Sequence, residues 1–175
     1  FTQIRWTSSG NGDTGAQPLI TTMHADRYGR LWIGTLAHGV LVVDLATGEW
    51  QRAHPGSIGA PGNLPAQPQL SIATTNEMLF VGTWGSGVYR APLEEPVFTL
   101  LAPGAGDGGL RDKNVTAVMG RAASGQPWVG SFQGGPQQVD VVAGTVVPTG
   151  GPPTDSIRKS GVLSFAVTQD GSHFA

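Results

Sequence analysis

Trp32-Ile33-Gly34-Thr35 is the first of three copies of one short segment, and Phe80-Val81-Gly82-Thr83 and Trp128-Val129-Gly130-Ser131 follow it at intervals of 48 residues. The same spacing separates three later glycines, Gly39, Gly87 and Gly135. Chance does not keep so many positions in phase. The 175-residue chain is therefore a tandem repeat of a glycine-rich, apolar unit.

Each unit contains four short runs that are rich in apolar and β-branched residues, which in the first unit are 20–24, 31–36, 40–45 and 49–53. In the third unit the third run is predicted at 138–142. Glycine or a polar cluster separates the runs. Four strands per repeat are typical of a propeller blade. We therefore predict an all-β fold, a β-propeller segment of about three and a half four-stranded blades. The predicted units are 18–56, 66–104 and 113–150, with an incomplete fourth unit at 160–175.

The repeated aromatic and the repeated glycine predict how the blades pack. A large flat side chain fills the wedge between two twisted sheets, so we expect Trp32, Phe80, Trp128 and Phe174 to lie between blades. Glycine in a strand permits a close backbone approach or a bend, and we expect this of Gly34, Gly82 and Gly130. Repetition in every unit argues that these are scaffold residues.

Composition limits the partners and cofactors. Charged residues make up 13% of the chain and the formal net charge is −2, so no basic stripe for nucleic acid is present. No apolar run reaches the length of a membrane span, and we expect no direct membrane insertion of this segment. The chain has no cysteine, and its four histidines show no metal-ligand spacing. We expect no metal and no other cofactor.

Three and a fraction units are fewer than the roughly four to eight blades of a closed ring. The chain is then a fragment of a longer propeller, two copies associate through exposed blade edges, or strands come from a partner. A fragment is the preferred interpretation, and a homodimer is the alternative.

The run 26–35, with Gly39-Val40 and the run 44–50, resembles the two-component regulator propeller repeat. Proteins built from that repeat carry a large periplasmic sensor of many blades, a membrane span and a cytoplasmic output domain. The resemblance implies a periplasmic, non-catalytic, ligand-sensing domain of a bacterial signal-transduction protein. It would be the input to a histidine kinase or a diguanylate cyclase.

A secreted carbohydrate-active propeller enzyme, sialidase-like or xyloglucanase-like, is one alternative, suggested by the run 80–90. Only half of the Asp-box turn of those enzymes is present, and no pair of catalytic carboxylates can be named. Asp44 and Asp140 end third strands, where an aspartate caps a turn, and Asp26 is expected to be a solvated turn acid. No catalytic residue is predicted. A protein-interaction scaffold is the other alternative.

A small-molecule site is predicted on the loops that follow the second strands. Leu36, Trp84 and Phe132 stand 48 apart directly after the repeated segment. Aromatic rings beside small polar groups can stack on sugar rings, so a carbohydrate is a suitable ligand. The blade-to-blade loops add cations that could select an anionic group. The predicted ligand-binding residues are Trp84, Phe132, His38, Ser86, Gln133, Lys113 and Arg158. Alternatively, Trp84 and Phe132 close the top of the inter-blade core.

Overall fold

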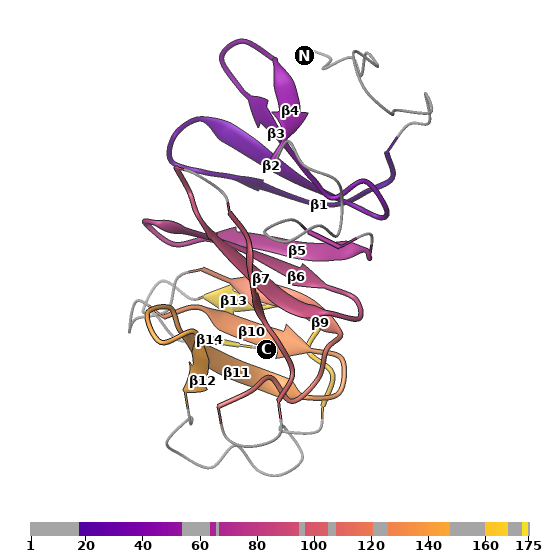
Figure 1. Ribbon diagram of the computed structural model, residues 1–175, viewed down its shortest axis with the longest axis vertical. Helices are drawn as coiled ribbons and strands as arrows, with labels where there is room; N and C mark the ends of the chain where they lie inside the picture. The colour runs from indigo at the N-terminus through magenta and orange to yellow at the C-terminus, as the bar shows by residue number, and fades with distance from the viewer. Residues whose placement is uncertain are drawn as a thin grey trace.

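The structure, a computed structural model, describes residues 18–53, 64–65, 67–94, 97–104, 108–120, 126–147, 160–167 and 173–174. Three four-stranded antiparallel sheets follow one another along the chain, and a two-stranded sheet comes last (Figure 1). In each four-stranded sheet the strands lie in chain order, so each sheet is a meander. Short apolar runs rich in β-branched residues form the central strands, such as Val40–Asp44 and Met78–Thr83, and both faces of these strands are buried.

The first sheet contains β1 (Ile20–Ala25), β2 (Arg30–Thr35), β3 (Val40–Asp44) and β4 (Trp50–Arg52). The second contains β5 (Gln69–Thr74), β6 (Met78–Thr83), β7 (Gly87–Pro92) and β8 (Thr99–Leu101). The third contains β9 (Val115–Met119), β10 (Trp128–Ser131), β11 (Gly135–Asp140) and β12 (Thr145–Val147). The two-stranded sheet pairs β13 (Ala166–Val167) with β14 (His173–Phe174).

The predicted all-β propeller-like class is confirmed, and the predicted strands agree with the observed ones to within a few residues. The largest difference is in β11, which begins at Gly135 although the sequence predicted 138. Ser131 pairs with Gly135, so the β10–β11 loop spans only three residues. Gly135 adopts a φ of 67°, which glycine accepts without steric cost and which permits this short loop.

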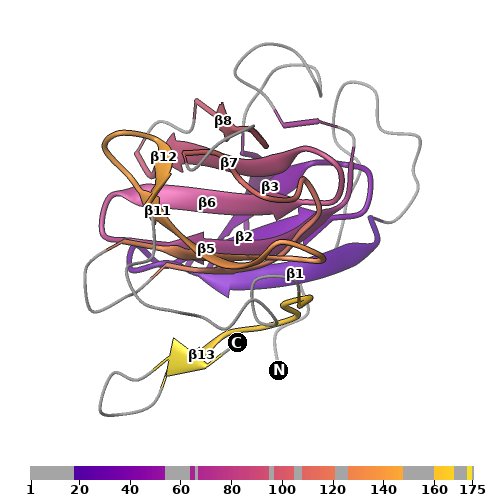
Figure 2. The ribbon, with the colours of Figure 1, turned by 90° about the horizontal axis from the view of Figure 1, so that it is seen from below.

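The sheets are stacked face to face, with β5 packed against both β1 and β9. Seen from below, β1 and β5 lie along one side of the stack and β8 along the opposite side (Figure 2). Apolar side chains fill the spaces between sheets. Trp32 is 1% exposed in the cluster between the first and second sheets, and Phe80 is 0% exposed between the second and third. The predicted inter-blade position of these two aromatic residues is confirmed.

Two further aromatic positions of the repeat differ from them. Trp128 lies at the same place in the third sheet but is only partly buried. The side chain of Phe174 lies outside the described residues.

The repeated glycines sit where the next sheet comes closest, which confirms the predicted close approach. A Cβ atom added at Gly34 would lie 3.0 Å from the backbone oxygen of Gln69. At Gly82 it would lie 2.6 Å from Cγ1 of Val115. At Gly130 it would clash with the side chain of Val162. In every case the equivalent inner residue of the following unit is among the nearest neighbours. At Gly34 and Gly82 the same sheet's inner strand is as close or closer, through Thr22 and Ser71 at 2.6 Å.

Candidate functional site

Trp84 and Phe132 form an exposed aromatic pair from two neighbouring sheets. Their ring centroids are 5.4 Å apart and their planes are inclined by 64°, an edge-to-face arrangement. Trp84 is 40% exposed and Phe132 is 45% exposed. The pair therefore joins two blades and also presents ring surface to solvent.

A threonine hydroxyl holds the loop that carries Trp84, and the first sheet has the equivalent bond. Before Phe132 the equivalent residue is Ser131, whose buried Oγ has no hydrogen-bond partner among the described residues. The Oγ1 of Thr83 donates to the backbone oxygen of Gly87 over 2.9 Å, and Thr35 makes the equivalent bond to Gly39 over 2.7 Å. Gly85 and Gly87 have φ angles of 106° and 95°, which close the turn. This explains why the repeated segment ends in Gly-Thr, a role that the sequence alone did not suggest.

The loop between the second and third sheets comes up against the Trp84 turn. The backbone oxygen of Lys113 accepts hydrogen bonds from the amides of Gly85 and Gly87, at 3.3 and 2.8 Å. The amide of Phe132 donates to the backbone oxygen of Asn114 over 2.9 Å. Lys113, an exposed residue, is thus held by its backbone beside the aromatic pair.

Asp112 ties Gln133 to the same loop. Its Oδ1 accepts from the amide of Asn114 at 3.0 Å, and its Oδ2 accepts from the amide of Gln133 at 2.8 Å. Both carboxylate oxygens thus hold the backbone in place. The structure therefore brings together four of the seven predicted residues, namely Trp84, Phe132, Lys113 and Gln133. We call them the aromatic rim.

Three predicted residues are not part of the rim as described. Ser86 hydrogen-bonds to the phenol of Tyr89, whose pKa is raised by burial, an effect that this bond partly offsets. His38 lies in the β2–β3 loop of the first sheet, where its amide donates to Thr35 Oγ1. Arg158 lies outside the described residues.

Arg111 was missed by the sequence reasoning. Its Nη1 donates to the backbone oxygen of Gly134 over 3.3 Å, so the guanidinium group lies beside the Phe132–Gly134 loop. The pairing of Gln137 Oε1 with the Arg111 amide at 2.8 Å fixes the backbone there. The only sequence feature that could have pointed to Arg111 is its position next to Asp112 and Lys113. Arg111 thus adds a cation beside the loop that carries Phe132.

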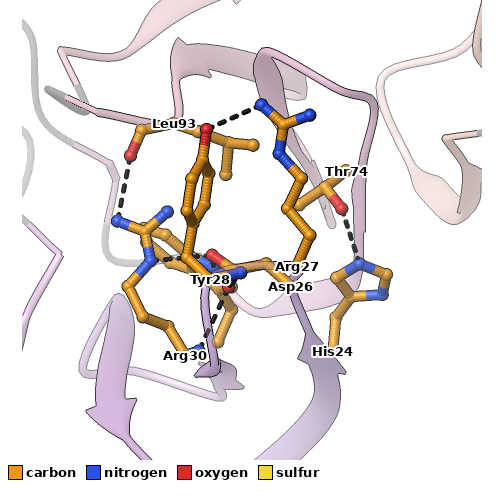
Figure 3. A network of polar contacts seen from close by, with 8 residues as sticks. His24, Asp26, Arg27, Tyr28, Arg30, Thr74 and Leu93 are labelled. Carbon is orange, nitrogen blue, oxygen red and sulfur yellow. Dashed lines mark hydrogen bonds and ion pairs between the residues drawn. The ribbon is translucent and has the colours of Figure 1, made fainter.

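A second polar cluster surrounds Asp26 (Figure 3). Its Oδ2 accepts from Nε of Arg30 at 2.7 Å and from Nε1 of Trp32 at 2.8 Å. Its Oδ1 accepts from the amides of Tyr28 and Arg30. The Asp26 side chain is 0% exposed, so the prediction that Asp26 is a solvated turn acid is wrong. The reason is that Arg30 and Trp32, which stand two residues apart in β2 and therefore point to the same side, both direct their donors at the Asp26 turn.

The electrostatics of Asp26 follow from these four donors. Burial by itself would raise the pKa of Asp26, but the hydrogen bonds from Trp32, from the Arg30 and Tyr28 amides and from the Arg30 side chain outweigh it. The pKa of Asp26 is therefore lowered, and the carboxylate remains ionised at neutral pH. Burial lowers the pKa of the nearby His24, an effect that the Asp26 charge partly opposes.

The Asp26 cluster also joins the first sheet to the second. Nη1 of Arg30 donates to the backbone oxygen of Leu93 over 3.1 Å, and His24 hydrogen-bonds to Thr74 Oγ1 over 2.9 Å (Figure 3). Arg90 of the second sheet donates in the same way to the backbone oxygen of Val141 in the third. Leu93 and Val141 stand 48 apart. We interpret this cluster as structural.

The turn acids Asp44 and Asp140 behave as the sequence predicted. The Oδ1 of Asp44 accepts from the amides of Ala46 and Thr47, and that of Asp140 from Val142 and Ala143. Backbone hydrogen bonds lower the pKa of both carboxyl groups. Within the described ranges no group of three or more metal-ligating side chains is found. No helix there is long and apolar enough to cross a membrane.

Comparison with solved structures identifies the class of fold. The chain is similar to the extracellular domain of the hybrid two component system BT3049 from B. thetaiotaomicron, at 17% identity and a TM-score of 0.65, over 88% of this chain and 18% of that one. It is also similar to the extracellular domain of the hybrid two component system BT4673 from the same organism, at 18% identity and a TM-score of 0.66, over 97% of this chain and 20% of that one.

A computationally designed protein, Ika8, is a third neighbour, at 16% identity and a TM-score of 0.60, over 91% of this chain and 46% of that one. The chain spans about a fifth of the length of the two extracellular domains. No protein-family model matches the sequence, and no curated protein matches it. At these identities the likeness establishes the fold, a segment of stacked propeller-like sheets.

Proposed function

We propose that this chain is a non-catalytic, ligand-sensing segment of a periplasmic sensor in a bacterial signal-transduction protein. Binding of a ligand to this segment would control the activity of a histidine kinase or a diguanylate cyclase. The structural neighbours are extracellular domains of hybrid two component systems, which supports this assignment. The resemblance of the run 26–35 to the regulator propeller repeat supports it independently.

The aromatic rim is the observation that carries the proposal. Two rings from successive blades stand exposed in an edge-to-face pair, and the backbone of Lys113 is held against them. An apolar ring face flanked by cations suits a sugar that bears a carboxylate. The carboxylate of Asp112, which is bonded to the backbone beside the rim, has both oxygens occupied by backbone amides, which favours binding over acid–base catalysis.

Trp84→Ala tests the rim. We expect the substitution to remove measurable binding of a uronate oligosaccharide in isothermal titration calorimetry, because it deletes the larger stacking surface. Since Trp84 is 40% exposed, the free energy of unfolding should change by less than about 1 kcal/mol. Leu100→Ala is the matched control, because Leu100 is 42% exposed on the outer strand β8.

Two results would count against ligand binding at the aromatic rim. One is equal loss of affinity in the Leu100→Ala control. The other is a large loss of stability in Trp84→Ala with affinity unchanged, which would make the aromatic pair a part of the inter-blade core alone. A neutral oligosaccharide of the same length, tested beside the uronate, separates ring stacking from charge recognition by Lys113.

A further inference from the structure

Arg111 places an exposed guanidinium group beside the aromatic rim, and hydrogen bonds of its backbone and of its side chain fix its position. Its amide donates to Oε1 of Gln137, which is 3% exposed and whose Nε2 donates to the backbone oxygen of Gly109 over 3.3 Å. Its Nη1 donates to the backbone oxygen of Gly134. The guanidinium group is therefore held against the loop that carries Phe132 before any ligand arrives.

Most of the hydrogen-bonding capacity of this guanidinium group is left to a ligand. A guanidinium group carries five N–H donors, and the bond to Gly134 uses one of them. Within the described ranges the one ion pair joins Arg30 to Asp26, so no described carboxylate lies within ion-pair distance of Arg111. The carboxylate of the neighbouring Asp112 has both oxygens engaged by backbone amides. The planar fork of an arginine suits a carboxylate that accepts two parallel hydrogen bonds.

The arginine at this position is not a feature of the repeat. The amides of the two rim aromatic residues donate to the backbone oxygens of Asn114 in the third unit and Pro68 in the second. This equivalence aligns Arg111 with Pro65. A cation at this position is therefore not required for one sheet to stack on the next, which leaves a role specific to the third unit.

The charged side chains of the described residues divide unequally between the two ends of the strands. Arg111 and Lys113 are exposed at the rim end, where β6 and β10 finish. Apart from Asp112, the described acidic residues lie in or beside the turns at the opposite end, where they outnumber the arginines: Asp26, Asp44, Glu49, Glu77, Glu94 and Asp140. This distribution attracts an anionic ligand to the rim end and repels it from the other.

We propose that Arg111 is the specificity-determining residue of an anion subsite beside the aromatic rim, where its guanidinium group binds the carboxylate of a uronate. The subsite rests on the ligand binding proposed above and assigns the recognition of charge to Arg111. Lys113 adds to the positive field, but it is held by its backbone, so its ammonium group is a point charge on a flexible stem. Gln137 is a positioning residue, because its hydrogen bond fixes the Arg111 backbone.

The test compares trigalacturonate with its fully methyl-esterified form, which has the same sugar rings and no charge, by isothermal titration calorimetry at pH 7. For the wild type we expect a dissociation constant about tenfold lower for the acid, because the ester cannot accept the two charged hydrogen bonds. Arg111→Gln should reduce this preference to about threefold or less and leave the affinity for the ester unchanged. Arg111→Lys should keep part of the preference, because it retains the charge without the fork.

Arg27→Gln is the matched control, because it removes the same charge from an exposed arginine at the opposite end of the strands. We expect this variant to keep the wild-type preference for the acid. Arg111 is itself exposed, so Arg111→Gln should fold, and circular dichroism checks this.

The outcomes that overturn the subsite are distinct from one another. Equal loss of affinity for both ligands in Arg111→Gln would mean that the guanidinium group only holds the loop. A preference that survives Arg111→Gln and disappears in Lys113→Gln would assign the recognition of charge to Lys113. Equal affinity of the wild type for acid and ester would leave stacking on the rim intact and remove the anion subsite. Binding of neither ligand would contradict the proposed ligand binding itself, and the subsite with it.

Discussion

Asp26 shows how a single residue can be placed by its neighbours rather than by its own position in a turn. Its carboxylate accepts four hydrogen bonds, two from backbone amides and two from the side chains of Arg30 and Trp32. The guanidinium of Arg30 also lies 5.0 Å above the Trp32 ring. The Asp26–Arg30 ion pair is part of the contact between the first two sheets, because Nη1 of Arg30 also donates a hydrogen bond to the backbone oxygen of Leu93.

Asp26→Asn should lower the free energy of unfolding at pH 7 by about 2–4 kcal/mol, because it leaves Nε of Arg30 and Nε1 of Trp32 without their charged acceptor. The lowered pKa of Asp26 also fixes the pH dependence. The stabilisation is present above the pKa of the unfolded chain and is lost as pH falls through the folded value. Urea unfolding from pH 7 down to acid measures both effects.

The asparagine variant should therefore show a shallower loss of stability in acid than the wild type does. Glu77→Gln serves as the control, since Glu77 is an exposed residue in the turn before β6. Its curve should follow that of the wild type. Parallel acid curves for Asp26→Asn and the wild type would mean that another group dominates the acid transition.

At the scale of the strand, glycine in the repeated segment is required by the neighbouring sheet. None of Gly34, Gly82 and Gly130 has a positive φ, so a left-handed backbone is not the reason for glycine there. Instead, the inner strand of the next unit lies against them. A side chain at these positions would separate the blades, so the glycine specifies the distance between adjacent sheets.

Gly82→Ala should destabilise the protein by about 1–3 kcal/mol, the usual cost of overpacking a core. The new Cβ would lie 2.6 Å from both Ser71 Oγ and Val115 Cγ1, so the second and third sheets must move apart. Thermal unfolding followed by circular dichroism measures the effect. Gly108→Ala is the control, because no atom lies within 4 Å of the Cβ position there. Equal stability of the two variants would contradict the proposed role.

At the scale of the whole molecule, each sheet is held mainly by its neighbours. The second sheet has an apolar cluster on each face, with Leu79 and Val81 turned to the first sheet and Phe80 to the third. Arginines reinforce both contacts by donating to carbonyls that stand 48 residues apart. Stability in such a stack comes from nearest-neighbour interfaces, as in repeat proteins.

The amides of β6 should therefore exchange with solvent most slowly, because Met78–Thr83 is a central strand of the only described sheet with four-stranded neighbours on both sides. The amides of β13 should exchange fastest among the strands. Hydrogen exchange followed by mass spectrometry resolves these segments. Slower exchange in β2 than in β6 would show that stability does not follow the number of neighbouring sheets.

Much of the fold could be predicted from the sequence, and the reason is that the repeat is local and in phase. The spacing of Trp32, Phe80 and Trp128 aligned the second strands, and short apolar runs between glycine or polar clusters marked the other strands. The start of β11 was missed because its short loop depends on the pairing of Ser131 with Gly135. The candidate site was only partly predictable, since Arg111 lies beside it through hydrogen bonds with Gly134 and Gln137, which are more than 20 residues away along the chain.

The sequence by itself determined the all-β class, the register of the repeated strands and the aromatic residues between sheets, because these depend on periodicity within and between short segments. Only the tertiary structure decided that Trp84 meets Phe132, that Arg111 lies beside them and that Asp26 is enclosed. Those outcomes depend on how side chains of neighbouring turns and sheets converge in space. Spacing along the chain cannot specify such contacts, because they are set by how closely the sheets pack.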